Sequence, residues 1–162
     1  MSPTLTVVYM SSGAVSSIRG MIIRQFQPQD EDAVVYLWKL CGLTRPSNDP
    51  HKDIRRKLRV RPDLFLVGVL DGQIVACVMA GYEGHRGWLH YWAVHASHQR
   101  EGLGRRIVTE AEDRLRASGC PKVNLQVRTS NRAAISFYER IGYSIDDVVS
   151  MGKRLQTDQP ST

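Results

Sequence analysis

Hydrophobic side chains recur along this chain with two periods, that of a strand and that of a helix. Met21 opens a strand pattern that runs to residue 26, and residues 64–70 and 73–82 are near-continuous apolar runs. Asp71-Gly72 between those runs is a strong signal for a tight hairpin. Strands that are apolar on both faces belong in the middle of a covered sheet. We also predict strands over residues 88–95 and 122–128, and one or two short final strands within 143–155.

Four helices are predicted between and after these strands. Pro28 opens the first, with acidic residues in its first turn, where negative charge suits the helix dipole. Asn48-Asp49-Pro50 marks the second, because a capping residue precedes a proline at the first helical position. Apolar residues spaced by four predict a long helix over 103–118, and a last helix covers 131–141. The order of elements predicts a mixed α/β sheet with helices on both faces.

Composition limits the class of protein. The chain has 162 residues, with 22 Lys plus Arg against 16 Asp plus Glu, which gives a net charge of +6 at neutral pH. This length suits one domain that buries a core without disulfides or metals. Three cysteines, Cys41, Cys77 and Cys120, without a Cys-x-x-Cys spacing, predict a reducing, cytoplasmic location. No apolar run approaches the roughly 20 residues that cross a bilayer, so no membrane partner is expected.

The two ends of the chain differ from its middle. Residues 1–20 are rich in Ser and Thr and lack the basic start of a secretory signal. We interpret them as an N-terminal extension that is either flexible or a start-site artefact. Residues 21–155 form the predicted domain, and residues 156–162 form a polar C-terminal tail.

The segment from His95 to Arg106 leaves a hydrophobic strand, turns through Gly102 and Gly104, and enters a helix. Unpaired amides at a helix start, with the positive end of the helix dipole, make an anion site. Glycine lets the backbone approach a phosphate closely, so Gly104→Val is expected to abolish cofactor binding and leave the protein folded. Neither a Walker loop nor a Rossmann fingerprint is present. For this segment alone, a tight turn with a solvated basic flank is the simpler alternative.

Two motifs together resemble the cofactor signatures of the GNAT (Gcn5-related) N-acetyltransferases. Gln99-x-x-Gly102-x-Gly104 is similar to the acetyl-CoA signature, and Asn131-x-x-Ala134-x-x-Phe137-Tyr138 is similar to the second motif. The resemblance covers residues 21–155, and both motifs stand in family order. Two further segments, Arg45-Pro46-x-Asn48-Asp49-Pro50 and residues 81–87, resemble the bacterial YpeA-type branch.

The resemblance implies a GNAT-like, mostly antiparallel sheet of six to seven strands that splays between its fourth and fifth strands and takes acetyl-CoA in the gap. It implies acetyl transfer to a primary amine of a small molecule or a protein N-terminus, by direct attack in a ternary complex. Tyr138 would be the general acid, with a core aromatic as its structural alternative, and a strand amide near Val94 would stabilise the oxyanion. The residues assigned to acetyl-CoA are Ala93, Val94, Gln99, Arg100, Glu101, Gly102, Leu103, Gly104, Arg105, Asn131, Ala134 and Tyr138.

The sequence leaves the general base open. Related ribosomal-protein N-acetyltransferases carry Glu where this chain has Gln126, whose amide cannot usefully accept a proton. We place Glu83 first as the base, with His90 or a water chain as alternatives. Each residue also has a structural interpretation, Glu83 as a hairpin-loop charge and His90 as a strand histidine packed beside Trp92.

Other functions and partners stay open. Because of Gln126, the chain could be a catalytically weak sensor of acetyl-CoA. The basic run over residues 55–61 could bind nucleic acid, but it lacks an aromatic stacking platform. Arg55 and Arg59 share a helix face and predict an acceptor mouth that favours neutral or acidic amines. No His-Glu-x-x-His or Cys-x-x-Cys pattern predicts a metal, and assembly as a homodimer is left open.

Overall fold

The computed structural model describes residues 17–18 and 20–158. Within these residues, six strands pair in chain order into one sheet. Neighbouring strands are antiparallel, except that β5 and β6 are parallel. The strands are β1 (Ser17–Ile18), β2 (Met21–Gln25), β3 (Phe65–Leu70), β4 (Gln73–Tyr82), β5 (Gly87–Val94) and β6 (Val123–Leu125).

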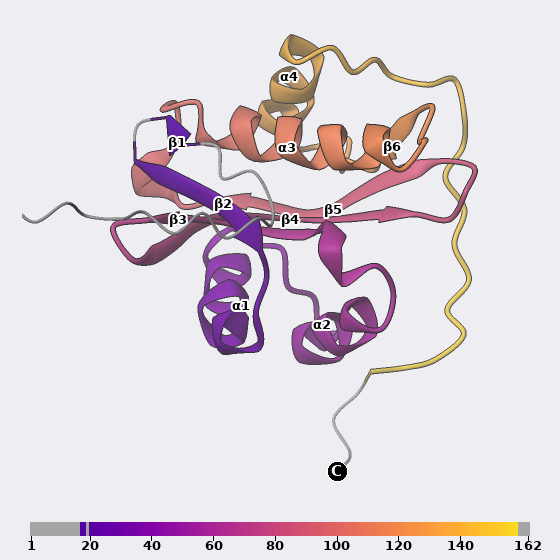
Figure 1. The fold of residues 1–162 in the computed structure, drawn as a ribbon. Coiled ribbons are helices and arrows are strands. Elements are labelled where there is room, and N and C mark those ends of the chain that lie inside the picture. Colours follow the sequence, from indigo (N-terminus) through magenta and orange to yellow (C-terminus); the bar gives the residue numbers. More distant parts are fainter. Residues whose placement is uncertain (1–16, 19, 159–162) are drawn as a thin grey trace, which may run out of the picture.

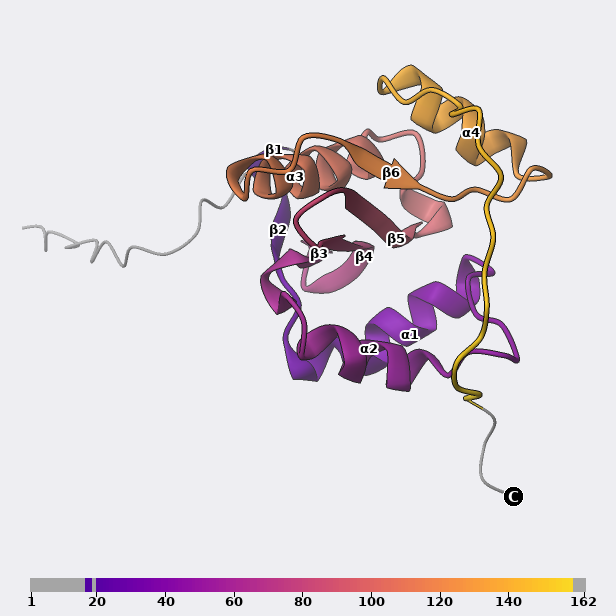
Figure 2. The ribbon, with the colours of Figure 1, turned by 90° about the vertical axis from the view of Figure 1, so that its right-hand side faces the viewer.

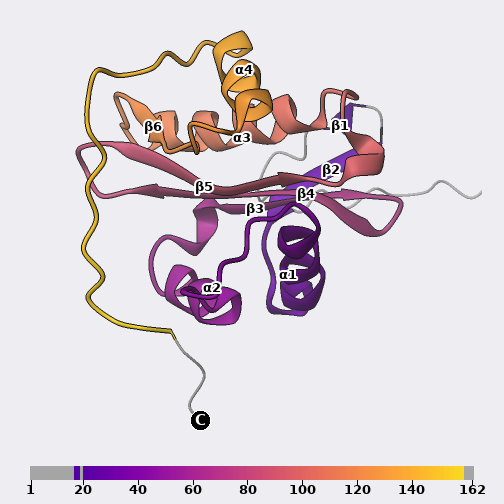
Figure 3. The same ribbon diagram turned by 180° about the vertical axis from the view of Figure 1, so that it is seen from behind.

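Two pairs of helices cover opposite faces of this sheet. Helices α3 and α4 lie on one face, and α1 and α2 lie on the other (Figure 1), as the view from behind also shows (Figure 3). The predicted α/β fold with helices on both faces is therefore confirmed. The helices are α1 (Glu31–Leu40), α2 (Pro50–Leu58), α3 (Leu103–Ala117) and α4 (Arg132–Arg140), with short 3-10 turns at Pro28–Asp30, Pro62–Leu64 and Ala96–His98.

Each face of the sheet has its own hydrophobic core. Leu66 and Ile107 belong to the core beneath α3, whereas Trp38 and Phe65 belong to the core beneath α1. Strands β3 and β4 send alternate side chains into both cores, which is why their sequences are apolar throughout. The prediction that these two strands occupy the covered middle of the sheet is confirmed.

Local chemistry explains two of the predicted boundaries. Asp71 and Gly72 have φ values of 49° and 76°, and a two-residue type I′ hairpin requires positive φ at both positions. The side chain of Asp49 accepts hydrogen bonds from the amides of His51 and Lys52 and so caps α2. The predicted hairpin and the predicted second helix start are both confirmed.

Strand β5 contains an extra residue close to the point where it parts from β6. Cys77 pairs with Ala93, whereas Met79 pairs with His90, so three steps along β5 match two along β4. Tyr91 within this bulge has a φ of 50°. Pairing between β5 and β6 ends at Leu89, opposite Leu125. These are the predicted fourth and fifth strands, since the prediction did not include β1, and the predicted splay between them is confirmed. Because a bulge shifts the alternation of side chains, His90 and Tyr91 both line the α2 side, and Trp92 packs on the α3 side.

The predicted final strands within residues 143–155 are wrong. No strand follows β6 in the described residues, and Ile145, Val148 and Val149 are 78%, 77% and 86% exposed. β6 is also shorter than the predicted strand over 122–128, because the chain beyond Leu125 no longer pairs with β5. The sheet still reaches six strands because β1, within the predicted N-terminal extension, pairs with β2. Residues 1–16 and 19 of that extension lie outside the described residues.

Residues 144–158 form a segment without helix or strand, which we call the C-terminal strap. It follows α4, runs along the β5–β6 side of the sheet and ends beside α2 (Figure 2). The strap therefore connects the two helical layers across the splayed side of the sheet. Polar contacts hold it, namely Lys122–Asp146, Gln126–Ser150, Arg154–Asn48 and Arg56–Asp158.

Candidate active site

The start of α3 presents backbone amides that the helix itself cannot pair. The chain enters α3 through Arg100 and Gly102, which have left-handed φ values of 66° and 79°. Gly102 is the N-cap, and no side chain in the described part of the chain caps this helix. The amides of residues 103–105 are therefore available as donors at the positive end of the helix dipole. This arrangement can bind an anion.

The predicted cofactor residues at this helix start come together in one loop and one helix turn. Of the seven predicted residues between 99 and 105, Leu103 and Gly104 are buried and anchor the turn, whereas the other five are exposed. The Glu101 carboxylate lies 3.3 Å from the ring of His98 in the preceding turn. The exposed residues are Gln99, Arg100, Glu101, Gly102 and Arg105.

Gly104 packs α3 closely against β5. A Cβ built at this position would lie 2.7 Å from the Trp92 ring and 3.3 Å from the Val94 side chain. The Trp92 indole also donates a hydrogen bond to the Gly104 carbonyl at 3.4 Å. We therefore expect Gly104→Val to destabilise the fold as well as to weaken cofactor binding, because the helix and the strand meet there. Gly102 differs, because a Cβ would meet nothing within 4 Å and only its positive φ constrains it.

Trp92 connects the two motifs that the sequence indicated. Its ring stacks on Phe137 with centroids 4.4 Å apart and lies 5.4 Å from the ring of Tyr138. Tyr138 is 7% exposed, and burial raises its pKa, so the hydroxyl stays protonated at neutral pH. Sequence reasoning named Tyr138 but assigned no role to Trp92, because its contacts depend on β5, α3 and α4 meeting in space.

Asn131 and Ala134 lie at the start of α4, the helix that carries Phe137 and Tyr138. The Asn131 side chain accepts a hydrogen bond from the Ala134 amide at 3.1 Å and is the N-cap of the helix. Helix capping is therefore one sufficient reason for an asparagine at this position. The predicted contact between Asn131 and acetyl-CoA stays a prediction.

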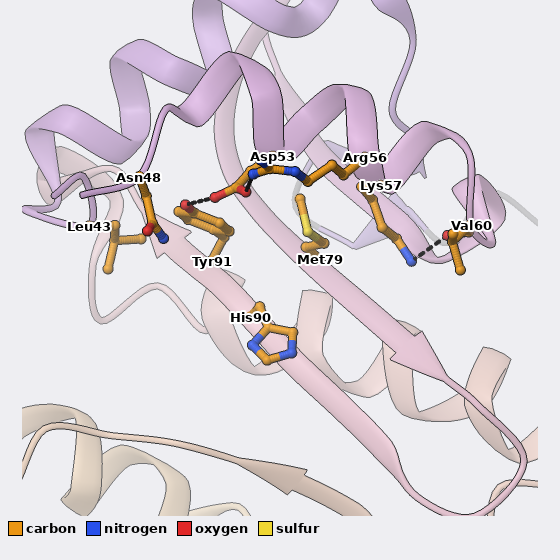
Figure 4. A pocket seen from close by; sticks show the side chains of 9 residues that line it. All are labelled: Leu43, Asn48, Asp53, Arg56, Lys57, Val60, Met79, His90 and Tyr91. Atoms are coloured by element: carbon orange, nitrogen blue, oxygen red, sulfur yellow. Dashed lines mark hydrogen bonds and ion pairs between the residues drawn. The ribbon is translucent and has the colours of Figure 1, made fainter. Parts of the chain in front are cut away.

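The opposite face of β5 forms the floor of a pocket of about 600 Å³ beneath α2. Figure 4 shows Asp53, Arg56 and Lys57 projecting from α2, with Tyr91 close to Asp53 and His90 farther along the strand. The Tyr91 hydroxyl donates to the Asp53 carboxylate at 2.6 Å. Two cations, one carboxylate and one imidazole therefore line a single pocket that also exposes the bulge of β5.

The pocket shifts the pKa values of three lining side chains. Burial lowers the pKa of Lys57 to about 8. The His90 ring reaches solvent at the mouth, but desolvation by the surrounding protein atoms lowers its pKa, and the Lys57 ammonium lowers it further. Burial and the hydrogen bond to Asp53 raise the pKa of Tyr91. The lowered pKa of His90 favours the neutral imidazole, which is the form that can accept a proton.

Glu83 lies apart from this pocket, in the turn between β4 and β5. Its carboxylate accepts hydrogen bonds from the amides of Arg86 and His85 at 2.9 Å and 3.2 Å, and these bonds lower its pKa. This is the hairpin-loop geometry considered for Glu83 above. His90 does line the pocket, and its ring stacks on Trp88 at 6.2 Å rather than beside Trp92 as expected. Its base role and that of Glu83 both stay predictions.

The cations of α2 that line the pocket are not the ones that the sequence suggested. Arg55 and Arg59 are exposed and do not line it, whereas Arg56 and Lys57 do. The fully buried side chain of Ile54 decides this orientation. Sequence reasoning did not single out Asp53, Lys57 or Tyr91. Spacing from Ile54 could have indicated Asp53 and Lys57, whereas the position of Tyr91 depends on the bulge in β5.

The described residues hold no group of three or more His, Cys, Asp or Glu side chains that could bind a metal ion. None of the helices in this part of the chain is long and apolar enough to cross a membrane. The cytoplasmic location and the homodimer stay predictions.

Comparison with known proteins agrees with this arrangement. The model of the acetyltransferase (GNAT) family matches residues 26–143. An acetyltransferase from Yersinia pestis (strain Pestoides F) is 46% identical over 139 residues, which cover 86% of this chain and 99% of the relative. The protein is an acyltransferase. The chain belongs to the acetyltransferase (GNAT) family, as the two motifs predicted, whereas the YpeA-type branch stays a prediction.

Two solved structures share the fold. Ard1 from Thermoplasma volcanium superposes with a TM-score of 0.69 at 25% identity, covering 78% of this chain and 84% of that one. The PaiA N-acetyltransferase from Thermoplasma acidophilum, solved in complex with coenzyme A, has a TM-score of 0.69 at 17% identity and covers 80% and 92% of the two chains. The predicted GNAT-like sheet is therefore confirmed.

Proposed function

We propose that this protein is an N-acetyltransferase that uses acetyl-CoA as its co-substrate and a primary amine as its acceptor. The observation that carries the proposal is the parting of β5 from β6 after Leu89. It exposes the bulged half of β5 between the uncapped start of α3 on one face and the pocket with Asp53 and His90 on the other. Two substrates can meet at one strand from opposite faces, which suits direct attack in a ternary complex.

The α3 side would hold the donor. The amides of residues 103–105 would bind the pyrophosphate, and Arg100 and Arg105 would add positive charge next to it. Beyond the last pair with β6, the backbone at Ala93 and Val94 would bind the pantetheine arm much as a sheet edge binds an added strand. Asn131 and Ala134 would flank the arm from α4.

Two features of the chain fit a ligand of this kind. A Cβ at Gly102 would meet open space, so the backbone of the helix start is accessible from outside. In addition, the buried Oδ1 of Asn124 has no hydrogen-bond partner among the described residues. Asn124 pairs with Trp88, one position before the last pair of β5 and β6. A buried acceptor without a donor is costly, and an amide N–H of the pantetheine arm would satisfy it.

The pocket side would bind and deprotonate the acceptor. Acetyl-CoA supplies an acetyl group on a thioester, whose carbonyl carbon the amine nitrogen attacks. An alkylamine with a pKa near 10 must first lose a proton, and His90 would accept it because its lowered pKa keeps the imidazole neutral. We assign this role to His90 ahead of Glu83, because Glu83 is held in its own turn. Tyr138, with its raised pKa, would donate a proton to the leaving thiolate.

Calorimetric titration with acetyl-CoA, followed by a thiol-release assay over a panel of amines, tests this function. Binding of acetyl-CoA together with amine-dependent thiol release would support it. Binding without release for any amine would favour the sensor alternative instead. Absence of binding would contradict both.

A matched pair of variants on one helix tests the donor site. Arg105→Gln removes a charge at the start of α3, and Arg116→Gln removes the same charge from its exposed last turn. We expect Arg105→Gln to weaken acetyl-CoA binding by about tenfold, the effect of one lost charge-assisted hydrogen bond, and Arg116→Gln to leave it unchanged. Equal effects of the two variants would show that acetyl-CoA binding depends only on the net charge of the protein and would contradict a specific contact with Arg105.

A further inference from the structure

The C-terminal strap ends in a formed carboxylate site on α2. The Asp158 side chain is 2% exposed and accepts hydrogen bonds from both terminal nitrogens of Arg56, at 2.9 Å and 2.5 Å. The backbone amide of Asp49 donates a third hydrogen bond to it at 3.2 Å. A bidentate guanidinium with one added amide matches the planar geometry of a carboxylate.

This carboxylate site adjoins the proposed acceptor pocket. Asn48, Asp53 and Arg56 line both the pocket that holds His90 and the cleft beneath the strap that holds Asp158. The Arg56 side chain is 43% exposed, so a ligand from solvent can reach it. One small molecule could therefore place a carboxylate on Arg56 and an amine in the pocket.

The strap is attached in a way that permits release. Val149, Met151 and Leu155 are 86%, 91% and 91% exposed, so the strap buries little apolar surface. The pair between Lys122 and Asp146 is exposed on both sides, and exposed ion pairs contribute little stability. The contacts Gln126–Ser150 and Arg154–Asn48 are exposed as well, so a ligand that competes for Arg56 displaces mainly the bonds of Asp158.

We propose that Arg56 is the subsite for a carboxylate of the acceptor, and that Asp158 occupies this subsite until the acceptor binds. The inference rests on the proposed acetyl transfer and specifies its acceptor as an amine that also carries a carboxylate, such as an amino acid or an acidic peptide N-terminus. A phosphate fits less well, because the Asp53 carboxylate bonds to the same guanidinium at 2.9 Å and would repel a dianion.

Steady-state kinetics with matched acceptors test this inference. Each ω-amino acid is compared with its own carboxamide, which keeps the amine and removes the negative charge. We expect Asp158→Asn to lower KM for the acids, and Arg56→Gln to raise it, each by about tenfold, with KM for the carboxamides unchanged. Asp146→Asn removes the same charge from a part of the strap that does not contact Arg56, and it should change neither. Wild-type enzyme that treats acids and carboxamides alike would overturn the inference.

Binding of glutarate, which has carboxylates and no amine, separates this inference from the proposed function. By calorimetry, glutarate should bind Asp158→Asn about tenfold more tightly than wild type, and adding Arg56→Gln should remove the gain. This result without turnover on any amine would support the carboxylate subsite while the proposed function fails. Turnover on amines with equal glutarate binding in all variants would overturn the subsite and leave the proposed function standing.

Discussion

The two faces of the sheet carry different kinds of functional structure. On the α3 face, the proposed donor site consists mainly of backbone, with left-handed residues at Arg100 and Gly102 and free amides at a helix start. On the α2 face, the proposed acceptor pocket consists of side chains from separate elements, such as Asp53, Lys57 and His90. A site made of backbone suits the donor, which does not vary, whereas side chains can adapt a pocket to one particular acceptor.

This difference also explains how the faces are stabilised. The α3 face joins its parts through a continuous aromatic cluster in which Trp92 contacts α4 and Gly104. The α2 face relies on polar pairs, Tyr91 with Asp53 and Arg56 with Asp158. We therefore expect changes on the first face to affect folding and cofactor binding together, and changes on the second to affect selectivity and pH dependence.

The largest effect is expected at Tyr138. Tyr138→Phe should lower kcat by about 10²–10⁴-fold, the usual contribution of a general acid, with acetyl-CoA affinity nearly unchanged. Single-turnover kinetics and calorimetry measure the two quantities separately. The neighbouring ring variant Phe137→Leu serves as a packing control and should reduce stability more than kcat. Unchanged kcat in Tyr138→Phe would mean that this tyrosine only fills the aromatic cluster.

A somewhat smaller effect is expected at His90, on the other face. His90→Gln should lower kcat/KM by about 10²-fold at neutral pH if the imidazole is the base. In wild type, activity should fall as the pH drops through the lowered His90 pKa, below its ordinary value of 6.5, because the protonated ring cannot accept a proton. His90→Gln should abolish this acidic limb of the pH–rate profile. A limb that persists in the variant would assign it to another group.

Gly104 tests whether the donor face couples folding to binding. Gly104→Val should reduce the free energy of unfolding by about 1–3 kcal/mol, because its side chain would overlap the Trp92 ring. Denaturant melts and acetyl-CoA titrations should both show the loss. Gly102→Ala, where the added Cβ meets open space, should cost only the penalty of roughly 1–2 kcal/mol for a left-handed residue. A fully stable Gly104→Val protein would refute the close packing of α3 on β5.

The smallest effect is expected at Glu83, which lies away from both sites. Glu83→Gln should change kcat/KM little and alter the free energy of unfolding by less than about 0.5 kcal/mol, as is usual for exposed positions. Activity assays run beside those of His90→Gln give the direct comparison. A large loss of activity in Glu83→Gln alone would restore it as the base.

The features that the sequence predicted correctly, on either face of the sheet, have local signals. Glycines, the Asp49 cap and the Asp71-Gly72 turn each act through their own backbone, so their effect is visible in a few neighbouring residues. The final strands over 143–155 were mispredicted because strand formation needs a partner edge, which no local pattern reveals. In the structure, this segment leaves the sheet and becomes the strap.

The acceptor face shows the limit of sequence patterns most clearly. The basic run on α2 predicted a charged mouth, but which cations line it depends on the rotation that buries Ile54. The bulge at Tyr91 likewise depends on pairing with β4, and it decides which face His90 lines.

The sequence alone therefore determined the family, most of the order of elements and the glycine turn into α3, because these depend on residues that are close in the chain. Tertiary structure decided the rest. It set Trp92 between two helices, placed His90 rather than Glu83 in the pocket, and brought Asp158 to Arg56. Asp158 and Arg56 are separated by 102 positions in the chain. Contacts over such a distance form only after the sheet and its two helical layers have assembled, so no local spacing encodes them.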